Sequence, residues 1–74
     1  SRLPVVNFST MEKILKKLGF EAVRQKGSHV FFRHKDGRTT TLPNHGGRVL
    51  ARPLIREILR EIEISLEEFN QLLK

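Results

Sequence analysis

Three histidines are the residues of this 74-residue chain best suited to chemistry, and the first stands in the stretch "QKGSHVFFRH". His29 follows a Lys-Gly-Ser turn and begins a run typical of a β-strand. It can be packed, bind a metal or transfer a proton. Side chains alternate along a strand, so His29 and His34 point to opposite faces and cannot close on one ion. The sequence also has no HExxH motif or other tight ligand spacing, so we expect no metal and no cofactor.

Proton transfer is a further chemistry open to His29. Ser28 is its neighbour in sequence, and adjacent side chains of an extended chain point apart, which argues against a Ser-His nucleophile. Histidine side chains ordinarily titrate near pH 6.5, and RNA carries its own nucleophile in the 2′-hydroxyl. Lys26, Arg33 or Arg38 can steady the charge on a phosphorane. These residues permit a metal-free ribonuclease, but they fit a non-catalytic RNA-binding module as well.

Gly27, Phe31 and His45 are further candidates for contacts with RNA. Gly27 can adopt a positive φ in the turn, and it leaves room for a polymer beside His29. Phe31 should be an exposed aromatic, suited to stacking a base or to a protein partner. His45, in "LPNHGG", can be a second proton-transfer group, an RNA contact or a residue that orders its loop. His34 should be structural, because its parity points it towards the helices.

A helix and three strands should position these residues. "FSTMEKILKKLGF" has helical periodicity, with Ser9 and Glu12 as a capping box and Gly19 as the helix stop. "FEAVRQ", "HVFFRH" and "RTTTLP" read as strands, joined by a Lys-Gly-Ser turn and a Lys-Asp-Gly turn. The sequence therefore predicts an antiparallel meander.

Two helices should follow the glycine-containing loop "NHGGRV". Pro53 suits the first turn of the second helix. Ser65 and Glu68 form a capping box for a short last helix over about 66–73. The apolar stripe of the second helix consists of Leu54, Ile55, Ile58, Leu59 and Ile62.

The predicted fold is one domain over residues 1–74, an α+β sandwich like the double-stranded-RNA-binding domain. It has an α-β-β-β-α order, a three-stranded antiparallel sheet, helices on one face and a short C-terminal helix. Val30 and Phe32 should face the helices, whereas His29, Phe31 and Arg33 should face solvent or a ligand.

Composition narrows the class of partner. The net charge of +6 favours polyanions, and nucleic acid is the first to consider. The absence of cysteine excludes a disulfide framework and suits the cytoplasm. No apolar run approaches the length of a membrane span, so we expect no membrane partner.

The motifs "LKKLGF", "RQKGSHVFFRHKDGRTTTLPNHGG", "LIREIL" and "ISLEEF" together resemble the HicA-type messenger-RNA interferase toxins of toxin-antitoxin systems. The resemblance runs from about Leu3 to Leu73. It implies a double-stranded-RNA-binding-like fold, metal-independent cleavage of messenger RNA and neutralisation by a HicB-type antitoxin. By the same resemblance His29 of the Gly-Ser-His motif is the catalytic histidine, and Gly27 is the motif glycine.

Two departures from the family pattern stand out. The hairpin turn usually reads His-Pro-Asp-Gly, and this sequence has Lys35 at the proline position. The link before the last helix usually carries a glycine near Glu63, so the sequence does not fix the residue at which the second helix ends. A third interpretation also remains, in which the chain acts mainly as the partner-binding subunit of a complex.

Overall fold

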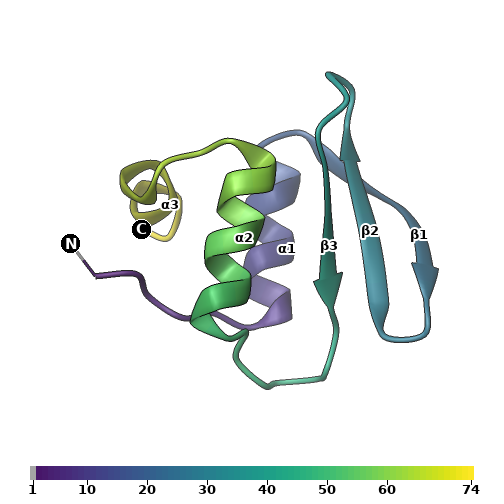
Figure 1. The fold of residues 1–74 in the computed structure, drawn as a ribbon, viewed down its shortest axis with the longest axis horizontal. Helices are drawn as coiled ribbons and strands as arrows, with labels where there is room; N and C mark the ends of the chain where they lie inside the picture. The colour runs from purple at the N-terminus through teal and green to yellow at the C-terminus, as the bar shows by residue number, and fades with distance from the viewer. Residues whose placement is uncertain (1) are drawn as a thin grey trace.

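The computed structural model describes residues 2–74 and contains three helices and three strands within them. The order is helix, three strands, helix and short helix, which confirms the predicted α-β-β-β-α arrangement with a C-terminal helix. In Figure 1 the strands stand on one side of α1 and α2, and α3 lies on the other side. The elements are α1 (Phe8–Lys17), β1 (Phe20–Lys26), β2 (His29–His34), β3 (Thr39–Pro43), α2 (Arg52–Ile62) and α3 (Leu66–Leu72).

The first helix begins two residues earlier than its sequence pattern predicts. Asn7 is the N-cap, and its side-chain oxygen accepts a hydrogen bond from the Thr10 N–H at 3.0 Å. The predicted capping box of Ser9 and Glu12 is therefore wrong, because Ser9 already lies inside the helix. The predicted stop is confirmed, since Gly19 follows the helix with φ of +97°.

The three strands form an antiparallel sheet in the order β1-β2-β3. Gly27 has φ of +60° in a two-residue turn, and Gly37 has φ of +101° in the next hairpin. A bulge interrupts the first strand, because Ala22 pairs with Phe32 and Arg24 with Phe31, which leaves Val23 without a partner.

One face of the sheet is buried against the helices. Val30 and Phe32 of β2 and Leu42 of β3 are almost fully buried, whereas His29 and Arg33 are exposed, as strand parity predicts. The other buried apolar residues are Leu3, Phe8, Met11, Ile14, Leu15, Phe20, Leu50, Ile55, Ile58, Leu59, Ile62 and Phe69. The opposite face of the sheet is thereby left open, with polar and charged side chains together with the half-buried Phe31 and the exposed Val23.

The link between α2 and α3 contains a residue in an unfavourable backbone conformation. Glu63 ends α2 with φ of +61°, in the left-handed region that glycine prefers. The glycine expected near this position from the family pattern would suit this geometry. The predicted capping box is confirmed, because the Ser65 hydroxyl accepts from the Glu68 N–H and the Glu68 carboxylate accepts from the Ser65 N–H.

Candidate functional site

His29 is the first residue of β2 and stands on the open face of the sheet, which is the face turned away from the helices. It is exposed, and it pairs across the sheet with Lys26 on β1 and Pro43 on β3. Paired residues of antiparallel strands have Cβ atoms about 5 Å apart, so the ammonium of Lys26 can reach the same ligand as the imidazole. Pairing with β1 on one side and β3 on the other thus fixes the start of β2, and His29 is presented to solvent from it.

The turn before His29 depends on Gly27. Its φ of +60° falls where other residues are strained, and a Cβ built on it would meet no heavy atom within 4 Å. The glycine is thus required by the backbone conformation, and the space beside the turn is open. The sequence had suggested both of these roles for it.

Phe31 and Arg33 share the open face with His29, as expected from their spacing along β2. Phe31 is half-buried where the sequence predicted an exposed aromatic, because the Arg24 guanidinium carbon lies 4.6 Å from the centre of its ring. Arg33 is exposed and pairs with Glu21 on β1 and Thr39 on β3. Arg24 is a member of this face that sequence reasoning missed.

Arg38 is not brought to the open face. Its guanidinium donates to the Asp36 carboxylate at 2.9 Å and to the backbone oxygen of Ile62, and lies 5.1 Å from the centre of the Phe20 ring. The Arg38 backbone N–H also donates to Asp36, which with the guanidinium charge lowers the pKa of that carboxyl. Arg38 thus fastens the β2–β3 hairpin to the end of α2, and its expected place among the phosphate contacts is not supported.

His34 packs on the helix side of the sheet, at the far end of β2 from His29. Its ring meets Phe20 edge-on at 5.1 Å, and its Nδ1 accepts a hydrogen bond from the Asp36 N–H at 3.1 Å. Gly19 lies against it, since a Cβ there would come within 3.0 Å of Nε2. These contacts agree with the structural role predicted for His34.

His45 is exposed in the loop between β3 and α2. The residue before it is tied to the β1–β2 turn, because the Asn44 N–H donates to the Ser28 oxygen at 2.6 Å. The loop that carries His45 therefore starts at the same end of the sheet as His29. Its role as a proton-transfer group, RNA contact or loop-ordering residue stays a prediction.

Residues 2–74 contain neither a cluster of metal ligands nor a membrane-spanning helix. Within that range, no three His, Cys, Asp or Glu side chains gather as a potential metal site. In the same range, no helix has the length and apolarity needed to cross a membrane.

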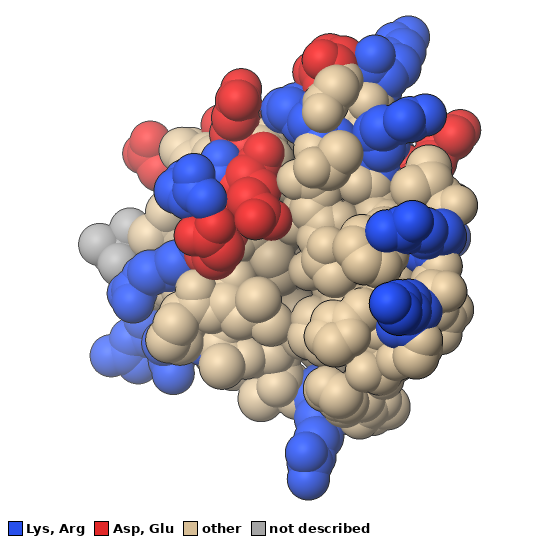
Figure 2. Space-filling view, turned by 45° about the vertical axis from the view of Figure 1, so that its right-hand side comes forward, with Lys and Arg blue, Asp and Glu red and all other residues tan. Residues whose placement is uncertain are grey.

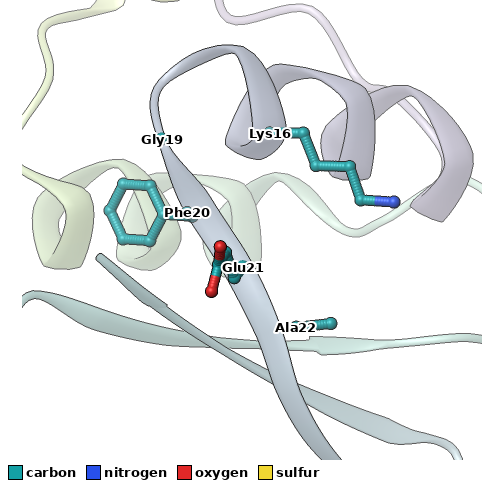
Figure 3. A pocket seen from close by; sticks show the side chains of 5 residues that line it. All are labelled: Lys16, Gly19, Phe20, Glu21 and Ala22. Atoms are coloured by element: carbon teal, nitrogen blue, oxygen red, sulfur yellow. The ribbon is translucent and has the colours of Figure 1, made fainter. Parts of the chain in front are cut away.

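A hollow of about 480 Å³ lies beside β1, near the end of α1. It is lined by Lys16, Gly19, Phe20, Glu21 and Ala22 (Figure 3). The Lys16 ammonium is 3.6 Å from the Glu12 carboxylate, and Phe20 is almost fully buried. His29 is not among its lining residues, so this hollow is separate from the site around the histidine.

Charge is divided unevenly along the chain. Residues 1–56 hold twelve of the 14 Lys and Arg and three of the 8 Asp and Glu, whereas residues 57–74 hold the other two and five. In Figure 2 most of the visible acidic side chains gather at the upper left, on the side of α2 and α3, while basic side chains lie along the right and also at the bottom and lower left. Residues 20–43, which form the sheet and its hairpin turns, hold five Lys and Arg against two Asp and Glu, so the sheet carries net positive charge that favours a polyanion.

The geometry around His29 combines an accessible imidazole with cations and an aromatic ring on one face. Comparison with known families gives a match to the model described as the HicA toxin of bacterial toxin-antitoxin systems, over residues 8–64. The matched range contains every candidate residue described above and excludes α3. No curated protein matches the chain.

Proposed function

This chain belongs to the HicA family of toxins from bacterial toxin-antitoxin systems, and we propose that it is a metal-independent endoribonuclease that cleaves messenger RNA with His29. The observation that carries the proposal is the exposed position of His29 beside Lys26, on the face of the sheet that no helix covers. An imidazole in such a place is free to exchange protons with a bound polymer.

The proposed reaction uses the nucleophile of RNA itself. His29 removes the proton of a 2′-hydroxyl, the 2′-oxygen forms a bond to the adjacent phosphorus, and the bond from phosphorus to the 5′-oxygen breaks. The leaving 5′-oxygen takes up a proton, and the products are a 2′,3′-cyclic phosphate and a 5′-hydroxyl. We assign the stabilisation of the negative charge on the phosphorane to Lys26, which pairs with His29 across the sheet, and we assign Arg33, four residues further along β2, to a flanking phosphate. His45 is the candidate for the group that supplies the second proton.

The proposed partners are messenger RNA, met in the cytoplasm, and a HicB-type antitoxin. Both fit the open face, because it presents cations and a partly exposed aromatic ring. An antitoxin that covers this face would neutralise the toxin by blocking His29.

Cleavage of labelled RNA in the presence of EDTA tests the proposal directly. The wild type should yield fragments with cyclic phosphate ends, and His29→Ala should lower the rate about 10²- to 10⁴-fold while the protein stays folded. Expressed without antitoxin, His29→Ala should no longer arrest growth. Salt-dependent binding of RNA with no cleavage at any pH from about 5 to 9 would instead identify a non-catalytic RNA-binding module.

A further inference from the structure

A second hollow lies on the open face beside the bulge in β1, and Phe31 in its lining is two residues from His29. Its volume is about 410 Å³, within the range of small-ligand sites. Phe31 and Val23 supply apolar surface, Arg24 and Arg33 supply positive charge, and Thr39 and Thr41 supply hydroxyls. It is separate from the hollow beside α1, whose lining includes none of these residues.

The position of this hollow relates it to His29. Phe31 is two residues further along β2, on the same face, which corresponds to about 7 Å along a strand. That distance is comparable to one nucleotide step of an unstacked strand. A polynucleotide with a phosphate at His29 would therefore carry a neighbouring base to Phe31.

The pair formed by Arg24 and Phe31 has the chemistry of a base-stacking platform. The guanidinium carbon lies 4.6 Å from the ring centre, so the cation–π contact holds the flexible arginine in place before any ligand binds. Bases of single-stranded RNA stack on aromatic rings and on guanidinium planes. The threonine hydroxyls along β3 are placed to meet the edge of a stacked base, and the cations suit the flanking phosphates.

We propose that Arg24 and Phe31 form a nucleobase subsite, which holds an unpaired base of the substrate RNA one nucleotide away from the phosphate at His29. The inference rests on the proposed ribonuclease function. The bulge at Val23 is the device that builds the subsite, because it lets Arg24 pair with Phe31 on the open face. Arg24 acts here as a positioning residue and takes no part in proton transfer.

Binding of single-stranded RNA in a His29→Ala background tests the subsite without cleavage. Arg24→Lys keeps the charge and removes the planar group, and Phe31→Leu keeps apolar bulk and removes the ring. Each should weaken binding about 5- to 100-fold. Arg56→Ala, an exposed site on α2, removes one charge elsewhere and should change affinity by less than about two-fold. Thermal melts establish that each variant is folded. If Phe31→Leu does not fold, Arg24→Lys alone still tests the subsite.

A photochemical cross-link locates the base. RNA containing 5-iodouridine should cross-link to Phe31 in the His29→Ala protein, and the adduct should be lost in the Arg24→Lys variant. Cross-links elsewhere with none at Phe31 would overturn the proposal. So would wild-type affinity of Arg24→Lys, since the arginine would then contribute charge alone.

Two further outcomes separate the rival explanations. If Arg24→Lys and Phe31→Leu leave RNA binding unchanged in the His29→Ala background, but allow the protein with His29 intact to escape neutralisation by a co-expressed antitoxin, the hollow is a protein-docking surface and the nucleobase subsite is refuted. If the wild type does not cleave RNA while the cross-link to Phe31 persists, the ribonuclease function fails and the base-binding surface stands.

Discussion

The two histidines at the ends of β2 should respond in opposite ways to the same truncation. His29 is exposed on the open face, so His29→Ala should change the free energy of unfolding by no more than about 0.5 kcal/mol. If it is the general base, the same change should lower RNA cleavage about 10²- to 10⁴-fold.

The corresponding cost for His34→Ala follows from its contacts. The edge-on contact with Phe20 at 5.1 Å contributes about 0.5 to 1.5 kcal/mol, since His34 takes the place of an aromatic partner. The hydrogen bond from the Asp36 N–H contributes about the same. A loss of about 1 to 3 kcal/mol should lower the Tm by roughly 4 to 24 °C in a domain of this size.

Circular dichroism melts and RNA cleavage on the same two preparations measure both effects. Cleavage by His34→Ala should stay close to wild type well below its Tm. If His29 acts as the base, His29→Ala should lose the part of the pH dependence of wild-type kcat/KM that this base confers. The reasoning is refuted if folded His34→Ala is inactive while His29→Ala still cleaves.

Three other predictions concern the hairpin and the end of α2. Arg38→Lys should lower the free energy of unfolding, measured in urea, by about 1 to 2 kcal/mol, because lysine lacks the planar guanidinium that joins the hairpin to α2. RNA binding by this variant should be unchanged. Arg33→Ala should do the reverse, weakening RNA binding with little change in stability. The backbone and guanidinium groups of Arg38 lower the pKa of Asp36 in the folded protein below the value of 3.8 for the unfolded chain. The ionised carboxylate therefore stabilises the fold at pH values above 3.8, and this stabilisation is lost as the pH falls through the folded pKa. Asp36→Asn should therefore show a smaller drop in Tm between about pH 5 and pH 2 than the wild type, and an equal drop would contradict the assignment. Glu63→Gly should raise the free energy of unfolding by about 1 kcal/mol, because glycine adopts the left-handed conformation without strain. Unchanged stability in urea denaturation would contradict this reasoning.

The arrangement around His29 could be predicted because β2 obeys strict alternation between two glycine-containing turns. Parity alone separated His29 from His34 and placed Phe31 and Arg33 with the former. The same parity applies to Arg38, which stands opposite His34 at the hairpin end, where its backbone oxygen accepts from the His34 N–H at 2.8 Å. Its place on the helix side was therefore available from the sequence once the turn was assigned.

The cap of α1 and the bulge in β1 could not be predicted in the same way. Ser9 and Glu12 have capping-box spacing, but Asn7 captures the helix start and Glu12 lies near Lys16 instead. The bulge depends on how β1 meets β2, which is a contact between segments. The sequence pattern predicts two strands of equal length, "FEAVRQ" and "HVFFRH", whereas the observed β1 (Phe20–Lys26) is one residue longer than β2 (His29–His34).

The bulge at Val23 has a consequence for the solubility of the sheet. β1 is an edge strand, and a long regular edge offers free N–H and C=O groups to the strands of other molecules. An extra residue bends that edge and breaks the spacing of those groups, and Arg24 and Lys26 add repulsion between like copies. The irregularity that shapes the hollow thus also discourages the growth of intermolecular sheets, which would otherwise threaten a toxin that leaves its antitoxin.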